Sequence, residues 1–158
     1  MRIIGLDYGD RTVGIAMSDP DGIIASPVET VFREEEIALK QTVRRIRQLA
    51  EENDVHLVVL GFPKNMDNTL GERAEKTLAF QKRLQRDLYR VEVVLWDERL
   101  STKGVERPLF EMGLDRKERK QYVDKMAAAY ILQGYLDAHP LRKEDKPLDT
   151  TDHTPEAR

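Results

Sequence analysis

The sequence predicts an α/β fold in which a mixed β-sheet carries helices on both faces. Two observations predict this fold. Short β-branched stretches near the amino terminus, separated by turn residues, indicate three antiparallel strands in a meander. Further along the chain, helical and apolar strand patterns alternate, which is typical of parallel strands joined by helices. The chain has 158 residues, a length that suits one domain with a substantial core.

Strong turn signals bound the strands of the predicted meander. The first strand is expected over residues 2–8 and the second over residues 12–18, with a tight turn between them. Residues 19–22 combine Asp, Pro and Gly, which favour a second turn. A third strand is expected to follow over residues 23–31.

The rest of the chain is predicted to alternate between helices and strands. A first amphipathic helix is expected over residues 34–53, with apolar residues on one face and basic residues on the other. The later elements are expected to be an apolar strand at 56–60, a helix at 71–88, a strand at 91–96, a short helix ending near 112, a charged loop at 114–122 and a final helix at 123–138. Large apolar residues almost disappear from residue 140 onward, so residues 1–139 are expected to form the folded domain and 140–158 a disordered polar tail.

The composition excludes several classes of protein. A formal net charge of -3 excludes a global basic field, so attraction to a nucleic acid would have to come from local patches. The absence of cysteine excludes disulfides and a thiolate zinc site. No apolar run approaches the roughly 20 residues that cross a bilayer, and the amino terminus lacks a signal-peptide pattern. We therefore expect a cytoplasmic protein with no membrane partner.

Three carboxylates lie where an acidic side chain is unfavourable. Asp7 lies in a strand with apolar residues on both faces, Glu98 follows the strand that ends near residue 96, and Asp124 belongs to the apolar stripe of the last helix. A buried carboxylate is costly unless it is paired or binds a metal. Carboxylate oxygens are the ligands that hard divalent cations prefer. The three acids therefore suggest a site for a hard cation.

Each of these acids also has a simpler explanation, which the spacing leaves open. Asp7 could accept hydrogen bonds from the turn that follows it, and Glu98 could pair with Arg99 or Lys103 at the surface. Asp124, in the first turn of the predicted helix, would be favoured there by the helix dipole alone. The three histidines show no spacing typical of metal ligands or of a catalytic triad, so they are interpreted as structural or surface residues.

Several segments near these acids could contact phosphate groups. Gly9 lies in the tight turn after Asp7, where a backbone N–H could meet an anion, although a hairpin glycine needs no ligand. A polar loop that precedes a helix contains Lys64 and Asn65 and could form an anion cradle or simply a solvated loop. Basic residues around the acids could form a rim that attracts a polyanion, or a solvated charged segment; these are Arg99, Arg116, Lys117, Arg119 and Lys120.

Taken together, these motifs resemble those of the YqgF (RuvX) family in the ribonuclease H-like superfamily. The resemblance covers residues 1–138 in the family's order. The matching stretches are Gly5-Leu6-Asp7-Tyr8-Gly9, Gly61-Phe62-Pro63-Lys64-Asn65-Met66, Asp97-Glu98-Arg99-Leu100-Ser101-Thr102 and Val123-Asp124-Lys125-Met126-Ala127-Ala128. Asn68, Gly104 and Pro108 depart from the family pattern, and none of them touches the three acids.

The resemblance implies both a fold and an activity. It implies a ribonuclease H-like fold with a five-stranded mixed sheet in the order 3-2-1-4-5. It also implies a nuclease in which Asp7, Glu98 and Asp124 are the catalytic residues and the ligands of Mg²⁺ or Mn²⁺, with two ions. Family members are described as candidate nucleases of the 5′ end of pre-16S rRNA and as resolvases of Holliday junctions. The expected partner is therefore structured RNA, with branched DNA as the alternative.

Two other classes of function remain open at this point. One is a non-catalytic nucleic-acid-binding module that keeps the fold without turnover, which the retention of all three acids disfavours. The other is an actin-like or sugar-kinase-like ATP site, whose first hairpin also carries Asp and Gly, although the short chain lacks a second lobe to enclose ATP. Both a monomer and a homodimer are compatible with the sequence, and a junction resolvase would need the dimer.

Overall fold

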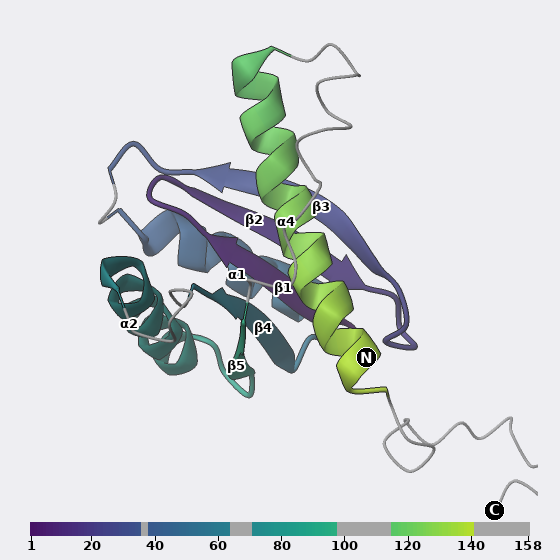
Figure 1. The fold of residues 1–158 in the computed structure, drawn as a ribbon. Coiled ribbons are helices and arrows are strands. Elements are labelled where there is room, and N and C mark those ends of the chain that lie inside the picture. Colours follow the sequence, from purple (N-terminus) through teal and green to yellow (C-terminus); the bar gives the residue numbers. More distant parts are fainter. Residues whose placement is uncertain (36–37, 64–70, 98–114, 141–158) are drawn as a thin grey trace, which may run out of the picture.

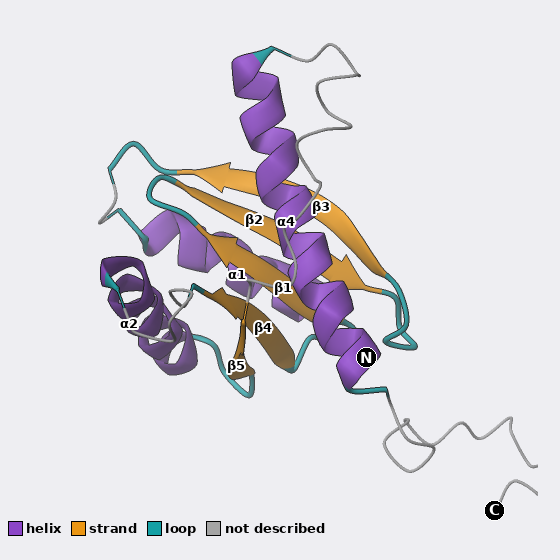
Figure 2. Ribbon diagram, in the orientation of Figure 1, coloured by secondary structure: helices purple, strands orange, loops and turns teal. Residues whose placement is uncertain are grey.

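The computed structural model describes residues 1–35, 38–63, 71–97 and 115–140. Its strands are β1 (Ile3–Tyr8), β2 (Thr12–Ser18), β3 (Ala25–Phe32), β4 (Leu57–Phe62) and β5 (Glu92–Asp97). Its helices are α1 (Lys40–Glu52), α2 (Glu72–Asp87) and α4 (Arg116–Ala138). The strands form one sheet in the order β3-β2-β1-β4-β5, and Figures 1 and 2 show the helices around it. This order confirms the predicted fold.

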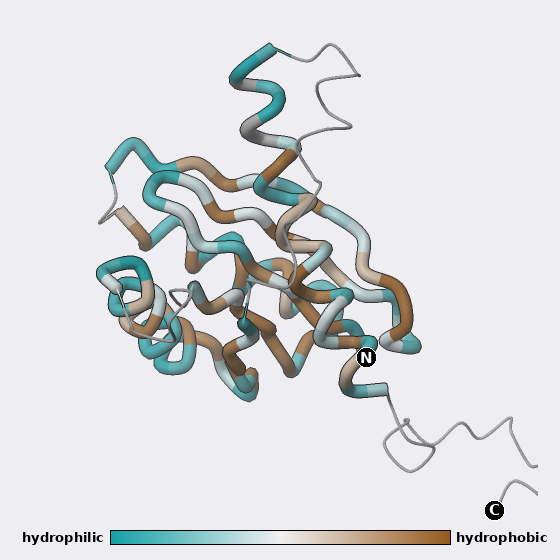
Figure 3. Tube along the Cα trace, viewed as in Figure 1, coloured by the Kyte–Doolittle hydropathy of each residue, from teal (hydrophilic) through white to brown (hydrophobic). Residues whose placement is uncertain are grey.

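The sheet combines antiparallel and parallel pairing, as predicted. β1 pairs with β2 and β2 with β3 in antiparallel register, whereas β4 is parallel to β1 and β5 is parallel to β4. Side chains alternate between the two faces of each strand. Ile4 and Leu6 belong to an apolar cluster with α1 and α2, whereas Ile3 belongs to a second cluster with α4. The helices therefore cover both faces of the sheet. Figure 3 shows apolar residues along the strands that lie between these helices.

Two glycines allow α4 to lie directly on the sheet. A Cβ atom on Gly14 of β2 would lie 1.9 Å from the backbone oxygen of Asp124, and one on Gly5 of β1 would lie 2.6 Å from the Cβ of Leu132. Real Cβ atoms do not approach other heavy atoms this closely. Close helix packing therefore explains both glycines, with no phosphate needed.

The structure corrects two predicted helix boundaries. α1 begins at Lys40 rather than at residue 34, and its buried side chains all lie beyond Gln41. α4 begins at Arg116, so the prediction of a loop at residues 114–122 was wrong. The Asp115 side chain caps this helix by accepting a hydrogen bond of 2.8 Å from the N–H of Glu118. The basic residues that follow are good helix formers, so the cap suffices to start the helix there.

The remaining elements match the prediction or lie outside the described residues. The five strands and α2 are confirmed to within two residues at each end. The predicted short helix ending near residue 112 and the polar tail lie outside the described part of the chain, so they stay predictions. Within the described residues, no helix is both long and apolar enough to cross a membrane.

The two edge strands of the sheet differ in their surroundings. Two glutamines of α2 bond the backbone of β5: Gln85 pairs with the carbonyl of Val91 and the N–H of Val93, and Gln81 donates to the carbonyl of Val93. Side-chain amides thus satisfy backbone groups that an edge strand would otherwise expose. β3 forms the opposite edge, and several of its apolar side chains are exposed.

Candidate metal and nucleic-acid site

The register of the sheet and the position of α4 bring Asp7 and Asp124 together. Leu6 and Tyr8 of β1 pack in the cluster with α1 and α2, so Asp7 between them faces α4. The cross-strand partner of Asp7 is Gly14. Side chains of directly opposed residues lie about 5 Å apart. Because the backbone carbonyl of Asp124 lies against Gly14, the two acidic residues are neighbours on one face of the sheet.

The burial of Asp124 removes one of its simpler explanations. Its side chain lies within the layer between α4 and the sheet, where the residue is only 7 % exposed. It falls in the third turn of α4, whereas the favourable field of a helix start fades within the first turn. The interpretation of Asp124 as an acid at the start of a helix was therefore wrong. Asp7, at the carboxyl end of β1, is half-buried.

The third predicted acid, Glu98, directly follows β5 in the sequence. β1, β4 and β5 are parallel, so their carboxyl ends meet at one edge of the sheet, which is where ligands bind in open α/β sheets. Asp97 ends β5, and Glu98 follows it. Glu98 itself lies outside the described residues, so its role as a ligand stays a prediction. Within the residues that the structure describes, no group of three or more acidic or histidine side chains could hold a metal ion.

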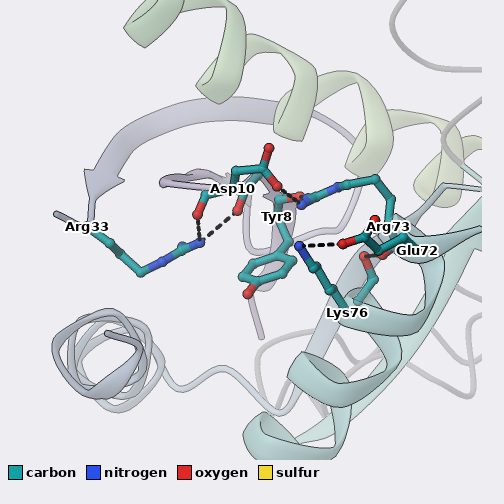
Figure 4. A network of polar contacts seen from close by, with 8 residues as sticks. Tyr8, Asp10, Arg33, Glu72, Arg73 and Lys76 are labelled. Carbon is teal, nitrogen blue, oxygen red and sulfur yellow. Dashed lines mark hydrogen bonds and ion pairs between the residues drawn. The ribbon is translucent and has the colours of Figure 1, made fainter. Parts of the chain in front are cut away.

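Arg73 of α2 ties the turn after Asp7 to the opposite helical layer (Figure 4). Its guanidinium donates to the backbone carbonyl of Tyr8 and, at 2.5 Å, to the carboxylate of Asp10. It also lies 5.4 Å from the centroid of the Tyr8 ring, which stacks on Phe80 at 4.2 Å. The residue that follows Asp7 is therefore held both by its carbonyl and by its ring.

Arg33 fixes the same turn from the end of β3 (Figure 4). Its buried side chain donates to the carbonyls of Gly9 and Asp10, each at 2.7 Å, and lies 4.9 Å from the centroid of the Tyr8 ring. Sequence reasoning missed both arginines, because an arginine after a strand or at the start of a helix is common and gives no local signal. Together they make the turn beside Asp7 a rigid support.

The structure describes only part of the predicted phosphate-contacting set. Arg116 is exposed and Arg119 half-buried in the first turns of α4, which extend beyond the sheet in Figure 1. The N–H of Gly9 donates to the carbonyl of Thr12 at 2.7 Å, so this N–H already has an acceptor. Three residues, Lys64, Asn65 and Arg99, and the side chains of Lys117 and Lys120 lie outside the described part.

Charged groups at the start of α4 affect one another. The protonated Glu118 carboxyl donates a hydrogen bond to the Asp115 carboxylate. This bond, and then the negative charge of Asp115, raise the pKa of Glu118 above its ordinary value. Protonation of Glu118 at low pH would remove a negative charge that partly neutralises the basic residues at the start of α4. The first turns of α4 thus combine an acidic cap with the arginines that could contact a polyanion.

The fold has a recognisable relative among solved structures. The structure of Thermus thermophilus RuvC in complex with a Holliday junction substrate superposes with a TM-score of 0.52. The match covers 87% of this chain and 94% of that chain, at 17% sequence identity. At this level of identity the similarity shows the fold alone. It confirms the ribonuclease H-like architecture.

Sequence comparisons identify the family. The sequence profile of the RuvX family, described as Holliday junction resolvase, matches residues 1–138. A protein of Acetivibrio thermocellus is 47% identical over 138 residues, which is 87% of this chain and 96% of that protein. A protein of Agathobacter rectalis is 50% identical over 137 residues, 87% of this chain and 95% of that protein. Both are named as candidate pre-16S rRNA nucleases. The chain belongs to the RuvX family.

Proposed function

We propose that this chain is a divalent-metal-dependent nuclease that hydrolyses phosphodiester bonds in the 5′-end processing of pre-16S rRNA. The proposal rests on one observation: Asp7 and Asp124 both lie next to Gly14, on the same face of the sheet. Membership of the RuvX family and the names of its relatives support the reaction and the substrate.

Asp7, Glu98 and Asp124 are the proposed catalytic residues and metal ligands. The donor set consists of carboxylate oxygens, which suits Mg²⁺ or Mn²⁺, and a buried acid such as Asp124 suits a nearby cation. Two such ions, when bound, would stabilise the negative charge that develops on the reacting phosphate. The chain's own contribution is placement: the turn held by Arg33 and Arg73 orients Asp7, and the contact at Gly14 positions Asp124.

The substrate is proposed to contact basic and polar groups around these acids. Because the net charge of the chain is -3, affinity for RNA would depend on a local set of contacts and would fall with salt. The proposed contact residues are Lys64, Asn65, Arg99, Arg116, Lys117, Arg119 and Lys120, whereas the N–H of Gly9, predicted to meet an anion, donates to the carbonyl of Thr12 instead. We place the protein in the cytoplasm, as a monomer or a homodimer, with structured RNA as its partner.

A second candidate function is the resolution of branched DNA. The description of the RuvX family as a Holliday junction resolvase favours it. A four-way junction is symmetric, so its resolution requires two equivalent sites held in one dimer. The two candidates therefore predict different assemblies as well as different substrates.

One experiment separates the candidates. The purified chain and its Asp7→Asn variant are incubated with a precursor 16S RNA fragment and with a four-way DNA junction, each with Mn²⁺. We expect Asp7-dependent cleavage of the precursor RNA at its 5′ side. Symmetric cleavage of the junction by a dimer, with the RNA left intact, would establish the resolvase. The absence of Asp7-dependent cleavage on both substrates would favour a binding module without turnover.

A further inference from the structure

We propose that Phe32 forms a stacking site for an unpaired base of the RNA, on the face of the sheet that carries the candidate metal site. The inference rests on the proposed nuclease function and deepens it, because it specifies a single-stranded segment next to the bond that is cut. It concerns the carboxyl end of β3.

The sheet register places Phe32 on the same face as Asp7. Phe32 pairs with Thr12 of β2, which shares its face with Gly14, the residue beneath Asp124. Val31, the residue before Phe32, packs against the cluster on the other face. The side chain of Phe32 therefore points to the face that carries both acids.

The distance between Phe32 and Asp7 follows from the same register. Asp7 pairs with Gly14, and Gly14 pairs with Thr30, two residues before Phe32 on β3. Two strand spacings and two residues along a strand separate the two positions by roughly 12 Å. In a stacked strand, phosphates follow one another about every 3.4 Å along the axis. A base roughly three or four nucleotides from the cleaved bond could therefore reach Phe32.

Phe32 offers the chemistry of a single-stranded nucleic-acid site. The residue is 48 % exposed although it belongs to a strand, so much of its ring is open to solvent. Aromatic rings stack on bases of any sequence, so this ring suits an unpaired base.

A second copy of the chain is a less suitable occupant of this surface. The other exposed apolar residues near β3, Ile23, Ile24 and Val28, lie toward its opposite end. Val28 is the extra residue where the register shifts, next to Pro27, which has no N–H to pair with another strand. Continuous strand pairing along this edge is therefore interrupted, whereas one exposed ring is sufficient to stack on a base.

The test compares Phe32→Ala and Phe32→Trp with the unmodified chain. Binding of a 12-nucleotide single-stranded RNA is measured by fluorescence anisotropy in EDTA, so that no turnover is needed. Stacking on one aromatic residue is typically worth about a tenfold change in affinity. We expect about tenfold weaker binding for Phe32→Ala and near-normal binding for Phe32→Trp, with the new indole emission quenched by the bound RNA. Tyr89→Ala is the matched control, because Tyr89 is 82 % exposed and precedes the amino end of β5.

The outcomes separate this proposal from the proposed function. Normal RNA binding by Phe32→Ala, or an unquenched indole in Phe32→Trp, would overturn the stacking site and leave the nuclease proposal standing. An equal loss in Tyr89→Ala would show a general effect of removing an exposed ring, and would also overturn the site. A failure of the unmodified chain to bind this RNA would overturn the stacking site, whereas the nuclease proposal is decided by the cleavage of precursor RNA with Mn²⁺. A dimer that Phe32→Ala dissociates in analytical ultracentrifugation would assign the ring to a contact between two copies.

Discussion

Replacing Gly14 with alanine should disrupt the candidate site without touching an acidic residue. The new Cβ would lie 1.9 Å from the carbonyl oxygen of Asp124 and 2.3 Å from its carbonyl carbon. Both of these atoms belong to the backbone of α4, which cannot rotate away as the end of a flexible side chain could. The helix must therefore move away from β2 and take Asp124 with it.

The size of the effect follows from these distances. Restoring an ordinary contact near 3.4 Å requires a shift of roughly 1.5 Å between α4 and β2. Overpacking of this kind costs about 1–3 kcal/mol of folding stability, which corresponds to roughly 2–4 °C in Tm per kcal/mol for a chain of this size. A displacement of about 1 Å in a catalytic group can reduce the rate about a hundredfold. We therefore expect a moderate loss of stability and a much larger loss of activity.

The assay measures both quantities on the same protein samples. Thermal unfolding gives Tm, Mn²⁺ titration calorimetry gives the affinity of the metal, and cleavage of precursor RNA gives the rate. Ile15→Ala is the matched control, since Ile15 is fully buried on β2 and faces the opposite side of the sheet. Its loss should cost about 2–5 kcal/mol of stability and leave metal affinity near normal in the folded protein. Equal metal affinity and rate in Gly14→Ala and the unmodified chain would refute the proposed placement of Asp124.

Four further predictions concern the metal, the acids, the start of α4 and His56. EDTA should abolish cleavage, and Mg²⁺ or Mn²⁺ should restore it; full activity in EDTA would contradict the metal mechanism. Asp7→Asn and Asp124→Asn should each lower turnover by more than about a hundredfold, because changes to groups that merely orient metal ligands already cost about 10–100-fold. Their Tm without metal should be unchanged or higher, and near-normal cleavage by Asp124→Asn would remove this acid from the site. Combined Arg116→Ala and Arg119→Ala should reduce the slope of log Kd against log salt by about 1.4 for single-stranded RNA, whereas the exposed pair Arg44→Ala and Arg47→Ala on α1 should not change it. The carbonyl of Arg90, and then Asp54, raise the pKa of His56 above its ordinary value. The stabilising contribution of His56 should thus be complete below about pH 6.5 and be lost as the pH rises through the folded pKa. The Tm difference between the unmodified chain and His56→Gln should shrink over that range, and an NMR pKa of His56 below about 6.5 would contradict this.

The strands were predictable because their signals are local. β2 begins and ends at the predicted residues, since turn-forming residues flank a β-branched run on both sides. The start of α4 was missed because its first turns extend beyond the sheet (Figure 1). A helical segment with nothing to bury needs no apolar stripe, so hydrophobic periodicity does not reveal it. The cap at Asp115 was the only sequence signal there, and an acidic residue in a charged stretch is easily overlooked.

The acids and the glycine of the candidate site differ in how well a sequence reveals them. Asp7 and Asp124 could be singled out because a charged group among apolar neighbours conflicts with its surroundings, and that conflict is visible locally. Gly14 carries no functional group, and its neighbours in sequence suit an ordinary hairpin glycine. A glycine is required at position 14 because the backbone of α4, a helix far along the chain, lies where a side chain would be. The residue that decides the spacing of the two acids is thus one that chemistry alone would not select, and for that reason Gly14→Ala tests the geometry of the site more directly than the removal of either carboxylate.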